Sequence, residues 1–274
     1  MTVAVCLTAT VLVLTTVRAD TTEEISRART LEADGRVDVA VEHLRAVLAG
    51  ESGGTDAALL LELARLTDDP DEALALADEA LANTRDAKLR ARAHVMRGDY
   101  LYAAGQYDRA VIEYASAAEG DGPEHPALRQ AASLLALGDI AAAVAIYDEA
   151  ASLDDASSDD AVEIADWASI GRGRALLAGG DAAEAAIELE QLADDLMGRT
   201  TRAHALAAAA EALIAHGDLG HARELLVLVS AEFPGTFEST LAEDRVRMLE
   251  RRLTKLDEPA GETPPDDAAT PESE

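Results

Sequence analysis

Six turn positions divide most of this chain into pairs of segments that share one spacing of small and apolar residues. The turns lie 33 to 42 residues apart, at Gly35, Asp68, Gly105, Gly138, Gly180 and Gly217. Glycine readily adopts the positive φ with which many helices end. On both sides of each turn, small and apolar residues recur every three or four positions, which is the period of an α-helix. The chain is therefore expected to form consecutive helical hairpins.

The stretch 91–118 shows this spacing most clearly. Small and apolar residues precede and follow the turn at Gly105, in the order Gly98, Leu101, Tyr107, Ala110, Tyr114 and Ala117. Residues after several turns are aspartates, which are good N-caps for a following helix: Asp139, Asp181 and Asp218. Pro70 suits the first turn of a second helix, where a missing N–H costs nothing.

This pattern resembles the tetratricopeptide repeat (TPR), a helical hairpin of about 34 residues. The sixth pair even ends in the proline typical of the repeat, Pro234. The resemblance implies an all-α fold, a right-handed α-solenoid of about six TPR-like hairpins over residues 20–256. A last amphipathic helix over 236–255 is expected to cap the final repeat. Another kind of α-hairpin solenoid is the nearest alternative.

Composition agrees with closely packed helices. Hydrophobic residues make up 49% of the chain but aromatic residues only 3%, whereas sheets favour β-branched and aromatic residues. The formal net charge is −30, which disfavours binding to nucleic acid or to an anionic membrane surface.

The two ends of the chain differ from the repeats. Residues 1–19 carry no charge before Arg18, and their apolar run has the length of a signal-peptide core, although a basic start is missing. We expect a signal peptide cut before Asp20 or an uncleaved membrane anchor; a buried helix is the alternative. Residues 257–274 are acidic and rich in proline and are expected to be a disordered tail.

The sequence contains no recognisable catalytic motif. It has no glycine-rich phosphate loop, nucleophile elbow or HExxH, and its single cysteine is Cys6. His216 and His221 flank a turn at a spacing that does not share a helix face, so they are interpreted as solvated rather than metal-binding. We therefore expect no catalytic residue, no metal site and no cofactor.

A binding surface is implied by the TPR resemblance, because four positions of each first helix line the concave side of such a solenoid. These positions include Glu62 and Val95 and the candidate groove residues Arg65, Arg92, Tyr102, Trp167, Ile170, Arg174 and His204. Arginine and tryptophan commonly anchor interfaces, and arginine can hold a carboxylate with two bonds. Two alternatives stay open: Trp167 is part of the core, and the arginines pair with acids of adjacent repeats.

The expected function is a non-catalytic scaffold or adaptor for protein–protein interaction, exported or tethered at the cell envelope. Its partner is expected to be a protein or peptide, with membrane contact only through residues 1–19 if they are retained. The alternatives are an accessory factor for an envelope enzyme or assembly machine, and an anchored adaptor that faces the cytosol. The sequence leaves the oligomeric state open.

Overall fold

The structure is a computed structural model, and it describes residues 21–50, 56–118, 125–152, 159–196 and 200–257. The signal or anchor segment predicted for residues 1–19 and the predicted tail lie outside these residues, apart from Asp257. None of the helices in these ranges combines the length and the apolar composition that a membrane-spanning segment requires. The chain divides into two units, residues 1–175 and 176–274.

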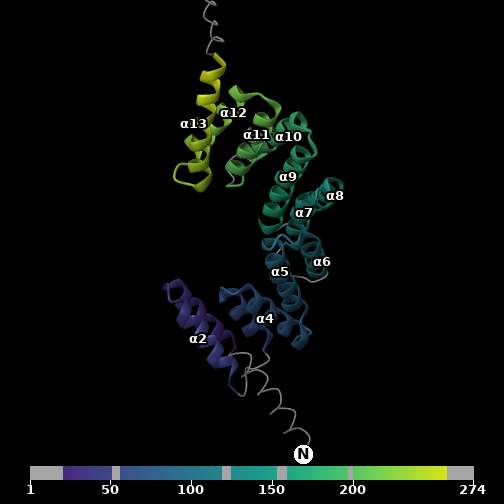
Figure 1. Cartoon of the computed structure of the whole chain (residues 1–274), viewed down its shortest axis with the longest axis vertical. Helices are drawn as coiled ribbons and strands as arrows, with labels where there is room; N and C mark the ends of the chain where they lie inside the picture. Colours follow the sequence, from purple (N-terminus) through teal and green to yellow (C-terminus); the bar gives the residue numbers. More distant parts are fainter. Residues whose placement is uncertain (1–20, 51–55, 119–124, 153–158, 197–199, 258–274) are drawn as a thin grey trace, which may run out of the picture. The chain divides into compact units, whose positions relative to one another are not determined.

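The described part of unit 1 consists of consecutive helices (Figure 1). A helix over residues 21–33 is followed by α2 (Val37–Leu48), α3 (Ala57–Leu66), α4 (Pro70–Asn83), α5 (Ala87–Ala103), α6 (Tyr107–Ala118), α7 (Pro126–Leu137), α8 (Ile140–Ala151) and most of α9 (Asp159–Gly179). Neighbours in sequence pack on one another from α2 to α8. The all-α prediction and the predicted helical hairpins are confirmed for this unit; the handedness of the solenoid stays a prediction.

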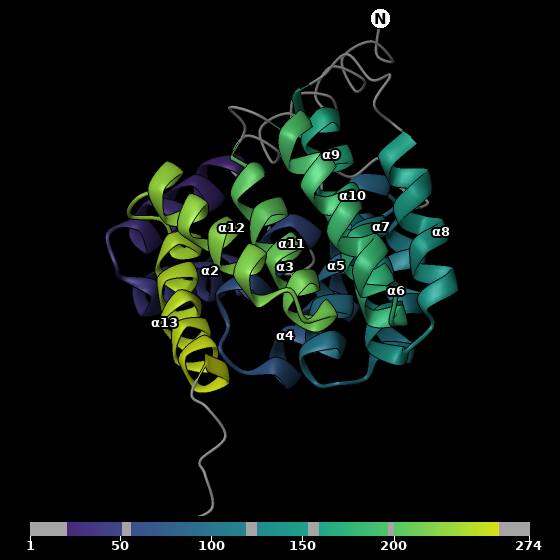
Figure 2. The ribbon, with the colours of Figure 1, turned by 90° about the horizontal axis from the view of Figure 1, so that it is seen from above.

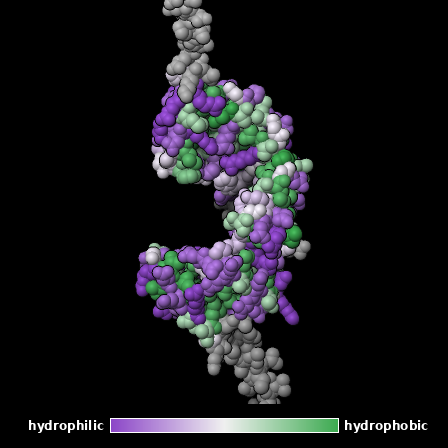
Figure 3. Space-filling view, viewed as in Figure 1, coloured by the Kyte–Doolittle hydropathy of each residue, from purple (hydrophilic) through white to green (hydrophobic). Residues whose placement is uncertain are grey.

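Unit 2 is built in the same way from the end of α9 and four more helices. These are α10 (Ala182–Asp195), α11 (Arg202–His216), α12 (Leu219–Glu232) and α13 (Phe237–Asp257). α13 packs on α12 and, less extensively, on α11 (Figures 1 and 2). The predicted last helix is therefore present and covers α12. On the side seen in Figure 3, hydrophilic and hydrophobic residues are interspersed over each unit.

The turns form where the sequence placed them. The five predicted turn glycines all have positive φ, from +73° at Gly105 to +101° at Gly217. Asp139 and Asp218 accept a backbone N–H at the start of α8 and α12, as predicted. Asp181 is the N-cap residue of α10, as predicted, but its side chain makes no capping hydrogen bond.

Close packing between helices depends on glycines that face tyrosine rings. A Cβ placed on Gly98 of α5 would lie 2.5 Å from Cε1 of Tyr114 on α6. Tyr114 is buried with Val95 and Leu101 in one apolar cluster, and its hydroxyl donates to Asp99 at 2.8 Å. Burial raises the pKa of this phenol, and the bond to Asp99 acts in the same direction. Val95, predicted to face the concave side, is instead part of this core.

Candidate functional site

The most distinctive surface of unit 1 is an open groove with a volume of about 500 Å³. It is lined mainly by first helices of three successive hairpins: α5, α7 and α9. The lining residues are Tyr102, Leu128, Ala132, Leu135, Ala136, Tyr147, Trp167, Ile170, Gly171 and Arg174. Four of the seven predicted site residues therefore come together in one place: Tyr102, Trp167, Ile170 and Arg174. We call this surface the aromatic groove.

Tyr102 forms one wall of the aromatic groove and is 39% exposed. Its ring packs edge-on against that of Tyr107 at the start of α6, with 5.1 Å between ring centroids. Such edge-to-face pairs add to the stability gained from buried area alone. Tyr102 is thus held in position while a large part of its surface stays available.

Trp167 and Ile170 lie on α9, and their exposures differ. Ile170 is 1% exposed and so belongs to the floor of the groove, packed between helices. Trp167 is only partly buried, and its indole N–H donates to Glu163 one turn earlier at 3.4 Å. The tryptophan is therefore neither wholly core nor wholly exposed; it presents an aromatic surface in the groove.

Arg174 supplies positive charge to the aromatic groove. It is exposed, and among the residues that the structure describes no carboxylate forms a salt bridge with it. Burial raises the pKa of Tyr147, and the positive charge of nearby Arg174 acts against that rise. By contrast, Arg172 on the same helix is paired with Asp148 at 2.8 Å. Arg174 is therefore the cation that this groove can offer to an acidic ligand.

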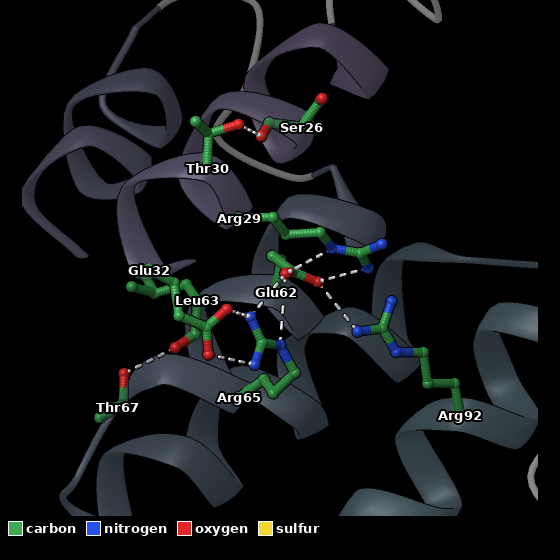
Figure 4. Close-up of polar contacts among 9 residues, drawn as sticks. All are labelled: Ser26, Arg29, Thr30, Glu32, Glu62, Leu63, Arg65, Thr67 and Arg92. Atoms are coloured by element: carbon green, nitrogen blue, oxygen red, sulfur yellow. Dashed lines mark hydrogen bonds and ion pairs between the residues drawn. The ribbon is translucent and has the colours of Figure 1, made fainter. Parts of the chain in front are cut away.

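The other predicted arginines belong to a separate cluster around Glu62 (Figure 4). Glu62 on α3 is completely buried. Arg29 donates to both of its carboxylate oxygens, at 3.0 and 3.1 Å, and Arg92 on α5 donates to Oε2 at 3.0 Å. Arg65, also on α3, donates to Glu62 Oε1 at 2.9 Å and to Glu32 at 2.5 and 2.8 Å. One buried carboxylate thus joins the first helices of three successive hairpins.

The electrostatics of the cluster follow from these bonds. Burial by itself raises the pKa of Glu62, but the hydrogen bonds from the three arginines outweigh it and lower the pKa to about 2. The bond from Arg65 likewise lowers the pKa of Glu32, and the two glutamates together raise that of Arg65. Glu62 is therefore ionised throughout the neutral range, and a buried charge of this kind requires its partners.

This arrangement matches the alternative interpretation of Arg65 and Arg92. Both pair with acids of their own or adjacent repeats, and neither lines the aromatic groove. Glu62 was expected on the concave surface and is buried instead. Its position inside the apolar run of residues 59–63 was a signal of this, because an isolated charge in such a run must find partners.

His204 belongs to unit 2, whereas the other predicted site residues belong to unit 1. It sits on α11, and its Nε2 is 3.0 Å from a carboxylate oxygen of Glu238 on α13. A residue that the sequence did not single out, Arg202, is buried at the start of the same helix. It donates to the carbonyl of Ala193 and to Glu232 at 3.0 Å, so it ties α11 to α10 and α12.

A second hollow offers fewer kinds of side chain for binding a ligand. It runs along the outer side of the helix over residues 21–33 and is lined by Thr22, Glu23, Ser26, Arg27 and Thr30, all from that one helix. It contains no aromatic residue. Over the described part of the chain, no group of three or more histidine, cysteine, aspartate or glutamate residues is arranged to hold a metal ion. The aromatic groove is thus the stronger candidate site.

Solved structures with a similar arrangement of helices include a type IV pilus biogenesis factor and a TPR repeat-containing protein. PilW, a type IV pilus biogenesis factor, matches with a TM-score of 0.60 and 15% identity, over 81% of this chain and 97% of that one. PilF of Pseudomonas aeruginosa matches with a TM-score of 0.57 and 17% identity, over 84% and 99%. The C-terminal part of a TPR repeat-containing protein from Cytophaga hutchinsonii matches with a TM-score of 0.50 and 12% identity, over 83% and 95%.

These likenesses concern the fold. The chain has the helical-repeat fold of TPR proteins, as the spacing of its turns predicted. No family model matches the sequence, and no curated protein matches it.

Proposed function

We propose that this protein is a non-catalytic scaffold or adaptor that holds a protein partner in the aromatic groove. The observation that carries the proposal is the composition of this groove. The structure brings the chain's single tryptophan together with Tyr102 and with Arg174, which has no carboxylate partner among the described residues. Aromatic and arginine side chains are the types that contribute most to binding at protein interfaces.

The chemistry of the groove favours a partner segment with apolar and acidic side chains. Leu128 and Leu135 on α7 and Ile170 on α9 offer apolar surface, and Arg174 can hold a carboxylate with two parallel bonds. The segment is extended or helical, because the groove crosses several helices rather than enclosing a compact cavity. Repeat helices hold the lining residues in place, so little conformational entropy of the protein is lost on binding.

The Glu62 cluster supports the assignment of partner binding to the aromatic groove. In the first three hairpins, Arg29, Arg65 and Arg92 are bonded to Glu62, and Arg65 also to Glu32. Those guanidinium groups are already engaged, whereas that of Arg174 has no carboxylate partner among the described residues. Binding is therefore assigned to the surface formed by α5, α7 and α9, and stability to the cluster.

The proposed location is the cell envelope, to which residues 1–19 would export or tether the chain. The similarity of fold to PilF and PilW motivates a more specific version, an accessory factor for an envelope assembly machine. An anchored adaptor that faces the cytosol is the remaining alternative. Sequencing of the N-terminus from native cells separates these: a chain that begins at Asp20 supports export, and a retained Met1 in the membrane fraction supports an anchor.

The test of function is partner capture by tagged protein in native cells, followed by binding measurements with the purified partner. Arg174→Glu and Trp167→Ala are each expected to weaken binding at least about tenfold, the effect of losing one interface anchor. The matched controls are Arg109→Glu and Ile112→Ala, exposed residues of α6 outside the groove, which should bind normally. Equal binding by all four variants, with unchanged helicity, would refute the proposal.

A further inference from the structure

One position of the repeat carries a charged residue in every hairpin but the fourth. It lies on the first helix of each hairpin, six residues before the turn residue, and we call it the inner position. In chain order it holds Arg29, Glu62, Asp99, Ala132, Arg174 and Glu211. The uncharged exception, Ala132 of α7, lines the aromatic groove together with Arg174 of α9.

The charged residues at the inner position pair with opposite charges, except for Arg174. The pairs are Arg29 with Glu62 at 3.0 Å, Arg129 with Asp99 at 2.5 Å, and Arg245 with Glu211 at 2.5 Å. The first of these joins the inner positions of two successive hairpins. Arg174 follows Ala132 in the same way, and it forms no salt bridge with any residue that the structure describes.

The third hairpin shows what surrounds a carboxylate at the inner position. Tyr114 of α6 lies nine residues after its turn glycine, and its hydroxyl donates to Asp99 Oδ1 at 2.8 Å. Arg129 of α7 donates to the same oxygen at 2.5 Å. A phenol and a guanidinium thus hold one carboxylate between them, and both act as hydrogen-bond donors.

The fourth hairpin has the equivalent tyrosine but alanine at the inner position. Tyr147 of α8 also lies nine residues after its turn glycine. It is only 6% exposed and lines the groove, and its hydroxyl forms no hydrogen bond with any residue that the structure describes. Burial raises the pKa of this phenol, so it stays protonated at neutral pH and can donate. The groove therefore contains a buried donor for which the described chain supplies no acceptor.

Arg174 lies close to the hydroxyl of Tyr147. A Cβ at Gly171 would lie 2.5 Å from Cζ, the ring carbon that bears this hydroxyl. Gly171 thus lets the tyrosine reach the face of α9 on which Arg174 follows three residues later. Besides the larger effect of burial, the charge of Arg174 lowers the pKa of Tyr147, and Tyr102 raises it. A phenol and a guanidinium are therefore brought together here, as they are around Asp99.

We infer that an aspartate or glutamate side chain of the partner binds in the groove beside Ala132, held by the hydroxyl of Tyr147 and the guanidinium of Arg174. Tyr147 is then a residue that determines which partner segments bind. This inference rests on the proposed function and adds to it the position of one acidic side chain. Along α7 the groove lining continues on both sides of Ala132, at Leu128 and Ala136, which suits an acid within a segment better than a chain end.

The first experiment places the carboxylate in the chain itself. Ala132→Asp gives the fourth hairpin the residue that the third has at the inner position, and Ala132→Asn gives an uncharged side chain of the same size. Urea unfolding of the full chain compares these two variants, alone and combined with Arg174→Gln or Tyr147→Phe. The unfolding constant of Ala132→Asp should be about tenfold smaller than that of Ala132→Asn, the usual effect of a hydrogen bond to a charged group.

Each of the two added substitutions should reduce this difference, because each removes one of the donors. Equal unfolding constants for Ala132→Asp and Ala132→Asn would overturn the inference. A difference that neither Arg174→Gln nor Tyr147→Phe reduces would also overturn it, since the carboxylate would then be stabilised by other groups.

The second experiment measures binding of the purified partner that is captured with the tagged chain. Ala132→Asp should weaken binding at least about tenfold, because its carboxylate engages both donors and repels the acid of the partner. Tyr147→Phe, which keeps the ring, should weaken binding about 3- to 10-fold. The control is Ala145→Asp, which adds the same charge at an exposed residue of α8 outside the groove and should bind normally.

The outcomes separate this inference from the proposed function. If Trp167→Ala and Arg174→Glu weaken binding but Ala132→Asp and Tyr147→Phe do not, the groove binds the partner and only this inference is overturned. If none of the four variants weakens binding, the proposed function fails and this inference fails with it. If amidation of the partner's C-terminus abolishes binding while amide replacement of its acidic side chains does not, the carboxylate belongs to the chain end and the inference is overturned.

Discussion

Tyr147 of α8 and Gly171 of α9 touch so closely that no other residue fits at position 171 without a shift. A Cβ built there would lie 2.3 Å from Cε1 and 2.5 Å from Cζ of the tyrosine ring. Both residues line the aromatic groove, next to Ile170. The contact therefore sets how near α9 lies to α8, and with it the distance of Trp167 and Arg174 from the rest of the groove.

Gly171→Ala is expected to destabilise the protein and weaken partner binding together. Overpacking of a helix interface costs about 1–3 kcal/mol, and the better helix propensity of alanine returns about 1 kcal/mol of that. Urea unfolding gives the change in stability. Gly220→Ala on α12 is the control: its Cβ would have 3.8 Å to the nearest atom, so no loss is expected there. Equal stability of both variants would show that the Tyr147 contact is not tight.

Glu62→Gln is expected to cost about 3–5 kcal/mol, the usual effect of removing one partner from a buried charged cluster. The change keeps the size of the side chain but leaves Arg29, Arg65 and Arg92 without the charge that they surround. Glu42→Gln on the exposed side of α2 is the matched control and should change stability by less than about 0.5 kcal/mol. If the two substitutions have similar effects in chemical denaturation, the cluster does not join the hairpins as described.

The same carboxylate predicts an acid-dependent loss of stability. The pKa of Glu62 falls from 4.5 to about 2 on folding, so its contribution is complete above about pH 4.5 and declines as the pH drops toward 2. The full contribution is about 3 kcal/mol, at 1.36 kcal/mol for each unit of pKa. Many other carboxylates titrate in this range, so the quantity to measure is the difference between the unaltered protein and Glu62→Gln. That difference should shrink between pH 5 and pH 2; a constant difference would contradict the assigned role of Glu62.

Tyr107→Ala tests whether the position of Tyr102 matters for binding. Tyr107 lines no part of the groove but packs against the ring of Tyr102 at 5.1 Å. Loss of this support should weaken partner binding by a factor of about 3–10, since such ring pairs contribute about 0.5–1.5 kcal/mol. Tyr107→Phe keeps the ring contact and should bind normally. Normal binding by the alanine variant would show that Tyr102 needs no support from α6.

The hairpins could be predicted from the sequence because their determinants are local. A glycine with positive φ ends a helix wherever the next helix follows at once, as at Gly138 and Gly217. Of the positions that the TPR resemblance assigned to the concave side, Tyr102, Trp167 and Arg174 lie in one groove, whereas Val95 and Glu62 are buried. What the groove binds remains a prediction, because a repeat fold defines a surface and leaves its ligand open.

Pairing of arginines with acids of adjacent repeats was one of the alternatives, but which arginines pair could not be predicted, because it depends on distances between helices from different hairpins. Three arginines were assigned to groove positions of their first helices: Arg65, Arg92 and Arg174. Only Arg65 and Arg92 pair with the buried Glu62. Nothing in the sequence around Arg202 indicated that this side chain would be buried between α10 and α12. Such contacts follow from how hairpins stack, and the spacing along the chain does not specify them.

The central claim is that the partner binds in the aromatic groove, and site-specific photo-crosslinking in native cells tests it most directly. A photoreactive phenylalanine analogue is placed at Trp167 in one chain and at Ile112, on the exposed side of α6, in another. We predict that position 167 captures one defined protein, that position 112 does not, and that adding Arg174→Glu abolishes the capture. The same crosslinked protein from both positions, or capture that is indifferent to Arg174→Glu, would contradict the account.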